Sequence, residues 1–267
     1  MKAPVDASHA YRIRFVDGSE GSYRRTELGI RKQVQREGLD RLEPDEADLN
    51  RFVIFRCVVG SRAYGLDQDA SDSDYRGIYL PPSDLQWGLY GVPEQIERQE
   101  TQECYWEMQK FLTLALKANP TVLECLYTPL IELATPLALS LLEIRSAFLS
   151  RLIYQTYNGY VLSQFKKLEQ DLRTTGELKW KHAMHLIRLL QAGVSALRDG
   201  TIPVNVGDQR ERLLAIRRGE LPWEEVNEWR LDLHRQFAAA SETTRLPDRP
   251  DYDAANAFLL RARRSMV

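Results

Sequence analysis

The sequence of 267 residues has few cysteines and no long apolar run. Its three cysteines, Cys57, Cys104 and Cys125, are widely spaced, which excludes a disulfide framework and the usual spacing of zinc ligands. No apolar run approaches the roughly 18 residues that a transmembrane helix needs. The N-terminal residues also lack the apolar core of a secretory signal. We therefore expect a cytoplasmic protein with reduced thiols and no membrane partner.

A large excess of charge of one sign is also missing. The formal net charge is −2, and 28% of residues are charged, which is ordinary for a folded protein and excludes a uniformly basic coat for nucleic acids. The charge is nevertheless uneven, because residues 151–220 are net basic and residues 1–150 are net acidic. This distribution suits a metal-bound polyanionic substrate, but on charge alone a chance spread of solvated surface charge is the better explanation.

The spacing of apolar residues changes near the middle of the chain. Strands are expected at 51–60, 76–82 and 94–106, and helices at 24–38 and 107–119. Further helices are expected at 137–169, 178–199, 208–219, 222–240 and 252–265. The pattern predicts the α+β class, with a domain of strands and helices at residues 1–140 and an all-helical domain at 141–267.

Two acidic residues, Asp72 and Asp74, stand immediately before the expected strand at 76–82. Side chains two residues apart on an extended segment point to the same face. Neighbouring carboxylates repel each other unless a positive charge lies between them. Hard oxygen ligands without histidine or cysteine favour Mg²⁺ or Mn²⁺. The pair is therefore a candidate metal site.

The strand expected at 51–60 is closed by Gly60 and followed by Ser61, and ten residues separate Ser61 from the acidic pair. Glycine lets a ligand approach the backbone closely, and serine offers a hydroxyl and an N–H to a phosphate. Arg62 and Arg76 flank the two motifs and are expected to neutralise phosphate oxygens. A strand, Gly-Ser, Asp-x-Asp and a second strand in this order are far more specific than either pair alone.

The segments GSRAYGL (60–66) and SDSDYRG (71–77) resemble the signature of the polymerase-β-type nucleotidyltransferase superfamily. The wider sequence resembles its RNA-ligase-associated, YcgL-like branch. The resemblance implies a mixed-sheet nucleotidyltransferase core, two Mg²⁺ or Mn²⁺ ions and a nucleoside triphosphate (NTP) donor. It further implies that Gly60 and Ser61 hold the triphosphate, while Asp72 and Asp74 bind metal and are catalytic.

The superfamily also uses a third carboxylate on a later strand. Glu100 and Glu103 both fall in the corresponding stretch, and we favour Glu103 as the third catalytic metal ligand because it directly precedes Cys104-Tyr105-Trp106. Without such a residue, the resemblance implies nucleotide binding without efficient transfer.

One further set of candidates lies on the helix expected at 178–199. Lys181, His185 and Arg188 follow i, i+4, i+7 spacing and share a face of an otherwise apolar helix. These side chains are candidates for contact with NTP phosphates or an RNA backbone. A structural ion-pair network is the alternative interpretation.

The resemblance implies a metal-dependent nucleotidyltransferase that moves a nucleoside monophosphate from an NTP to an RNA 3′ end and releases pyrophosphate. The expected context is RNA repair or tRNA, with an RNA ligase as a partner. Two alternatives stay open. One is transfer to a protein or small-molecule hydroxyl, and the other is a non-catalytic nucleotide- or RNA-binding partner of an RNA ligase.

Overall fold

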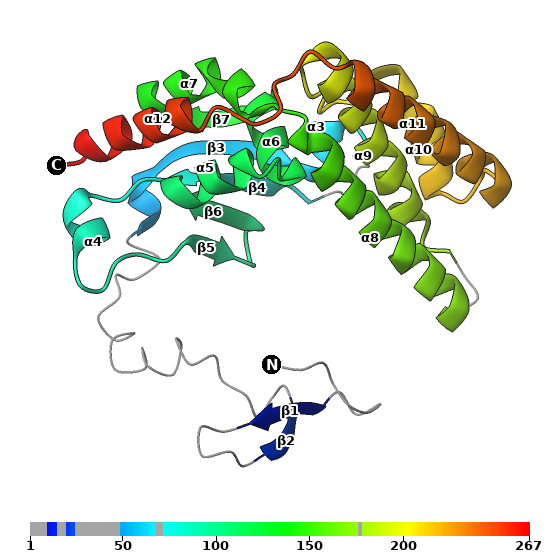
Figure 1. Cartoon of the computed structure of the whole chain (residues 1–267), viewed down its shortest axis with the longest axis horizontal. Coiled ribbons are helices and arrows are strands. Elements are labelled where there is room, and N and C mark those ends of the chain that lie inside the picture. The colour runs from blue at the N-terminus through cyan, green and yellow to red at the C-terminus, as the bar shows by residue number, and fades with distance from the viewer. Residues whose placement is uncertain (1–9, 15–19, 25–48, 68–71, 176–177) are drawn as a thin grey trace. The chain divides into compact units, whose positions relative to one another are not determined.

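The computed structural model describes residues 10–14, 20–24, 49–67, 72–175 and 178–267 (Figure 1). The chain divides into two compact units, Met1–Pro44 with Leu89–Gly91, and Asp45–Gly88 with Val92–Val267. The described part of the first unit contains an antiparallel hairpin of β1 (Ala10–Arg14) and β2 (Glu20–Arg24). Residues 25–38 of the expected helix lie outside the described residues.

A five-stranded mixed sheet organises the second unit, with the strand order β5-β6-β4-β3-β7 (Figure 1). The five strands are β3 (Val53–Val59), β4 (Asp74–Tyr79), β5 (Gln95–Arg98), β6 (Glu103–Glu107) and β7 (Ile131–Ala134). β4 runs antiparallel to β3 and parallel to β6. The prediction of a single strand at 94–106 was wrong. This segment forms a hairpin of β5 and β6, with Gln102 at φ 54° in the turn.

Short helices follow several strands and begin at residues that suit a helix start. They are α3 (Gly60–Tyr64), α4 (Ser83–Trp87), α5 (Met108–Leu116), α6 (Pro120–Tyr127) and α7 (Pro136–Glu143). The Asn119 side chain accepts a hydrogen bond from the Val122 N–H, and proline occupies the first turn of α6. Thr135 caps α7 in the same way. The single helix expected at 137–169 is divided instead, because α7 ends at Glu143 and the next α-helix begins at Leu152.

The rest of the chain is helical. Its α-helices are α8 (Leu152–Thr175), α9 (Trp180–Asp199), α10 (Arg210–Arg217), α11 (Trp223–Thr243) and α12 (Tyr252–Arg264), and the 3₁₀ turns of the unit are η3 (Asn50–Phe52), η4 (Arg145–Phe148) and η5 (Gly207–Gln209). α9 packs against α8, α10 and α11, whereas α12 packs against α5 (Figure 1). The predicted α+β class with a helical C-terminal region is confirmed. The division at residue 140 stays a prediction, since the sheet and these helices belong to one compact unit.

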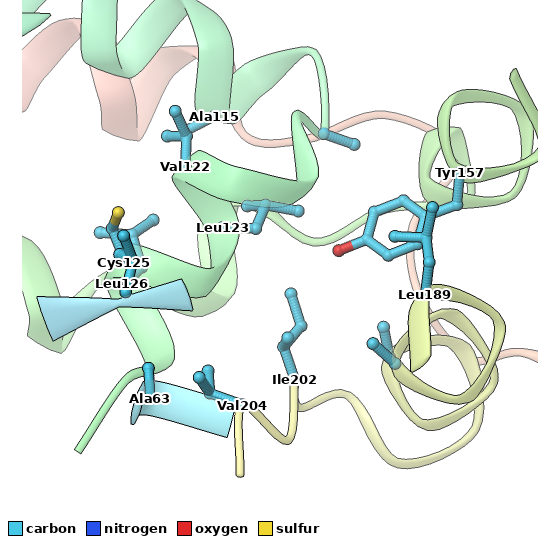
Figure 2. Close-up of a cluster of buried hydrophobic side chains, with 14 of the residues drawn as sticks. Ala63, Ala115, Val122, Leu123, Cys125, Leu126, Tyr157, Leu189, Ile202 and Val204 are labelled. Atoms are coloured by element: carbon cyan, nitrogen blue, oxygen red, sulfur yellow. The ribbon is translucent and has the colours of Figure 1, made fainter. Parts of the chain in front are cut away.

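A continuous apolar core joins the sheet to the C-terminal helices. Figure 2 shows α6 side chains between α3, α8, α9 and the segment that follows α9. The labelled members are Ala63, Ala115, Val122, Leu123, Cys125, Leu126, Tyr157, Leu189, Ile202 and Val204. The three cysteines are free and buried in this structure. None of the helices in the described ranges has the length and apolar character to span a bilayer.

The two faces of the sheet carry different side chains, because successive residues of a strand alternate between faces. The face that packs against α5, here the inner face, carries Cys57, Ile78 and Trp106, and the Trp106 ring lies 6.1 Å from that of Phe111 in α5. The opposite face, here the outer face, carries a second apolar cluster of Leu49, Tyr79, Ile96 and Tyr105. The face on which a charged residue lies therefore decides which site it can join.

Candidate active site

Gly60 and Asp74 meet at one end of the sheet. Val59, the last residue of β3, pairs with Asp74, the first residue of β4. Gly60 has φ +71°, a conformation that favours glycine, and a Cβ placed on it would lie 2.7 Å from the Asp74 Oδ2. Any side chain at residue 60 would displace the carboxylate. The two motifs singled out from the sequence are thus in direct contact.

The neighbours of this contact are accessible to a ligand. Asp72 is exposed and stands two residues before Asp74, while residues 68–71 lie outside the described part of the chain. Ser61 is half-buried, and its carbonyl accepts a hydrogen bond of 2.8 Å from the Leu66 N–H. Arg62 is exposed. At this end of the sheet Asp72 is therefore exposed, and Asp74, Gly60 and Ser61 are partly exposed.

Arg76 lies on the inner face of β4, as Asp74 does, because the two residues are two positions apart. Its Nη1 donates to the carbonyls of Tyr75 at 2.7 Å and Gln102 at 3.1 Å. These bonds hold the guanidinium where β4 and β6 meet. The predicted phosphate-binding arginine is therefore on the same face as the carboxylate.

Glu103 lies on the other face. The parallel register pairs it with Tyr75, so its side chain points to the outer face, opposite to Asp74. There its carboxylate lies 3.4 Å from the Arg56 Nη2, and the Arg56 guanidinium lies 4.2 Å from the Tyr75 ring centroid. Glu100 is exposed in the turn before β6. The structure therefore brings neither candidate for the third carboxylate to Asp74, and the described residues contain no group of three His, Cys, Asp or Glu side chains that could hold a metal.

The carboxylate of Glu97 on β5 shares the inner face instead, which the sequence interpretation missed. Glu97 pairs with Cys104, and Cys104 pairs with Arg76. Burial raises the pKa of the Cys104 thiol to about 11, with Glu97 adding to the rise and Arg76 opposing it. Tyr105 and Trp106 are both buried, on opposite faces of β6, so their apolar character in the sequence does not tell which face Cys104 and Glu97 share.

Arg188 reaches the helix that follows Gly60, but it does so through a buried ion pair. Its Nη1 lies 2.6 Å from the Glu124 Oε1, and its guanidinium lies 3.6 Å from the Tyr64 ring centroid. The Tyr64 hydroxyl donates to the other oxygen of Glu124 at 2.8 Å. Burial, outweighed by the nearby Glu124 carboxylate, leaves the pKa of Arg188 above its ordinary value. The alternative of a structural ion-pair network describes Arg188 in this structure.

Lys181 and His185, which were predicted on the same helix face as Arg188, have different surroundings. His185 lies edge-on to Tyr64, with ring centroids 6.4 Å apart. Burial, together with the positive charges of Arg188 and Lys181, lowers the pKa of His185 to about 4. It is therefore neutral at pH 7 and carries no charge for a phosphate. Lys181 is exposed.

Two arginines of the α10 region hold the turn that leads from α3 toward the acidic pair. The Arg210 Nε donates to the Gly65 carbonyl at 2.8 Å, and the Arg217 Nη1 donates to the Leu66 carbonyl at 3.2 Å. Nothing in the sequence indicates these bonds to the backbone, because the basic residues of 151–220 read there only as solvated charge or phosphate contacts. The helical region thus fixes the backbone on which Gly60 and Ser61 sit.

Comparison with known proteins gives two similarities. A family model described as the RNA repair pathway DNA polymerase beta family (RlaP) matches residues 32–261. The uncharacterized protein YcgL of Bacillus subtilis (strain 168) is 26% identical over 170 residues, which cover 62% of this chain and 64% of YcgL. The chain thus spans just under two thirds of the length of that relative.

Proposed function

The chain belongs to the RNA repair pathway DNA polymerase beta family, a group of polymerase-β-type nucleotidyltransferases, and on that premise we propose that it transfers a nucleoside monophosphate from an NTP to the 3′ end of an RNA. The observation that carries the proposal is the contact of Gly60 with the Asp74 carboxylate. It joins a turn suited to phosphate with a carboxylate suited to metal, and Gly60, Ser61 and Asp74 are all partly exposed.

The residues at this site fit one divalent cation. A side chain at residue 60 would fill the space against the Asp74 Oδ2, so the glycine leaves that oxygen free for a ligand. Asp72 supplies a second, exposed carboxylate. Mg²⁺ is commonly bound by one or two carboxylates, with substrate phosphates and water completing its shell. When bound, such a cation neutralises the triphosphate and stabilises the leaving pyrophosphate.

In the proposed reaction, the triphosphate lies along the Gly60–Ser61 turn, and Arg76 adds positive charge on the same face of β4. The 3′ hydroxyl oxygen of the acceptor forms a bond to the α-phosphorus. The bond from that phosphorus to the bridging oxygen of the β-phosphate breaks, pyrophosphate leaves, and the hydroxyl proton passes to solvent. The protein contributes position and charge neutralisation.

A second candidate function is nucleotide binding without transfer, as a partner of an RNA ligase. The orientation of Glu103 favours it, since that carboxylate faces Arg56 and leaves the inner face without a third carboxylate beside Asp74. A two-ion mechanism would need a ligand from elsewhere, and Glu97 is the carboxylate on the correct face.

The test is incubation with each α-labelled NTP, Mg²⁺ or Mn²⁺, and a single-stranded RNA with a free 3′ hydroxyl. We expect an RNA product longer by one or more nucleotides with the wild type and none with Asp74→Asn. Asp248→Asn is the matched control, because Asp248 is an exposed aspartate in the loop before α12.

Three results would overturn the proposal. Label on the protein with unchanged RNA would indicate transfer to a protein hydroxyl. Tight NTP binding with no release of pyrophosphate would indicate the binding partner. Extension of the RNA by Asp74→Asn at the wild-type rate would show that the reaction does not need the Asp74 carboxylate.

A further inference from the structure

A hollow of about 530 Å³ opens on the inner face of the sheet beside Arg76. Side chains of β5, β6, α5 and the residues around the start of α6 line it. Those used below are Arg76, Glu97, Lys110 and Asn119. The hollow is separate from the Gly60–Ser61 turn, because that turn follows β3 and the hollow lies toward β6, the neighbour of β4 on its opposite edge.

The position of the hollow relative to Asp74 indicates what it receives. Arg76 follows Asp74 by two residues on the same face, so the hollow begins about 7 Å along β4 from the carboxylate. The sheet order places Gly60 on the β3 side of Asp74 and the hollow on the β6 side. In phosphoryl transfer the attacking and leaving oxygens lie roughly in line across the phosphorus. A triphosphate at Gly60 therefore leaves the hollow to the acceptor.

An exposed aromatic ring stands beside the hollow. Tyr160 of α8 is 41% exposed, and its hydroxyl accepts a hydrogen bond of 2.9 Å from the side chain of Asn119, which lines the hollow. Asn119 is itself fixed as the cap of α6. Two other tyrosines of α8 differ from it, because Tyr157 is fully buried and the Tyr154 ring lies 4.9 Å from that of Phe237. Tyr160 therefore offers a nucleotide base a partly exposed ring whose hydroxyl is held in place.

Positive charge accompanies the ring. Arg76 and Lys110 both line the hollow, and Glu97 is the carboxylate on the same face. Lys110 pairs at 2.7 Å with Glu94, whose side chain is largely exposed. An exposed ion pair of this kind is worth little, so Lys110 can exchange it for a phosphate at small cost.

We propose that this hollow, with Tyr160 at its rim, binds the terminal nucleotides of a single-stranded RNA acceptor. A base stacks on Tyr160 and a backbone phosphate lies at Lys110, while Arg76, which lines the hollow two residues from Asp74, stays with the triphosphate. Stacking platforms next to basic side chains are how proteins bind single strands without reading their sequence. The inference rests on the proposed function, because that function supplies the reason for an RNA end to meet Asp74.

The test measures RNA binding without catalysis, by fluorescence anisotropy of a short 5′-labelled single-stranded RNA in the absence of NTP. Tyr160→Ala should weaken binding about 5- to 150-fold, the range expected for one stacked base. Tyr160→Phe keeps the ring and should bind within about twofold of the wild type. Lys110→Ala should weaken binding and lower the slope of log affinity against log salt by about 0.7. Tyr252→Ala, at an exposed tyrosine of α12, is the matched control and should bind as the wild type does.

The outcomes separate this inference from the proposed function. RNA binding that Tyr160→Ala does not change, or no RNA binding by the wild type, overturns the inference even if nucleotide transfer is observed. Equal losses for Tyr160→Phe and Tyr160→Ala would overturn it too, by assigning the loss to the hydrogen bond with Asn119. Binding that depends on Tyr160 and Lys110 without any transfer supports the hollow and refutes the proposed function.

Discussion

Replacing Arg188 by methionine tests whether this arginine is a structural residue or a phosphate ligand. The side chains of Arg188 and Glu124 are 10% and 4% exposed, so their ion pair is almost entirely removed from water. Arg188→Met keeps an apolar side chain of similar length. It leaves the Glu124 carboxylate buried with the hydroxyl of Tyr64 as its remaining partner.

The expected cost follows from that unpaired charge. Removing one partner of a buried ion pair destabilises a protein by about 3–5 kcal/mol. For a domain of this size, each kcal/mol lowers Tm by about 2–4 °C, so the expected fall is about 6–20 °C. The double variant Arg188→Met with Glu124→Gln also removes the unpaired charge of the Glu124 carboxylate. It should recover part of the loss, with a coupling of about 0.5–3 kcal/mol.

The assay combines urea unfolding of the four proteins of this cycle with NTP binding under folding conditions. A structural Arg188 predicts a large loss of unfolding free energy and an NTP Kd that stays within about twofold of the wild type. Arg198→Met is the matched control, because Arg198 is exposed on the same helix and pairs with Asp199. An Arg188→Met variant as stable as that control, but with weakened NTP binding, would refute the reasoning and restore Arg188 as a phosphate ligand.

Two further predictions concern stability. The pKa of His185 is about 4 in the folded protein and about 6.5 in the unfolded chain, so the unfolded chain binds more protons between pH 4 and 6.5. The free energy of unfolding should therefore fall by up to about 3 kcal/mol as pH drops from 7 to 4. His185→Gln should remove that part of the pH dependence of urea unfolding, and an unchanged pH profile would contradict the prediction. Gly77→Ala would place a Cβ 1.9 Å from the Phe55 carbonyl oxygen, so we expect circular dichroism to show loss of the folded protein. A Cβ at residue 159 has no atom within 4 Å, so Gly159→Ala should stabilise α8 by about 0.5–1 kcal/mol. A folded Gly77→Ala protein would contradict the first expectation and show that β3 and β4 can separate.

The contact of Gly60 with Asp74 was within reach of the sequence, and the orientation of Glu103 was not. A buried strand that ends in Gly60 and a second strand that begins at Asp74 meet whenever the two strands pair. The face of Glu103 depends on where β6 starts, and a shift of one residue reverses the face of every side chain. The turn at Gln102, which divides the expected strand, set that start.

The basic residues on one face of α9 show a similar limit of prediction from sequence. Helical spacing correctly placed Lys181, His185 and Arg188 on one side of the helix, but not the rotation of the helix against its neighbours. That rotation depends on Glu124 of α6, a helix that the sequence interpretation missed because its eight residues form a short apolar run between Asn119 and Thr128. Short apolar runs do not distinguish a strand from a buried helix.

The most direct test of the central claim is NTP binding by Gly60→Ala, with and without Mg²⁺ or Mn²⁺, beside Gly200→Ala. Both glycines have positive φ, +71° and +67°, so both variants carry the same kind of backbone strain, but nothing lies within 4 Å of a Cβ at residue 200. The wild type and Gly200→Ala should bind NTP tightly with the cation and weakly after chelation, and Gly60→Ala should bind at least about tenfold more weakly, a loss of ~1.4 kcal/mol. Wild-type affinity in Gly60→Ala, or NTP binding that chelation does not change, would contradict the account.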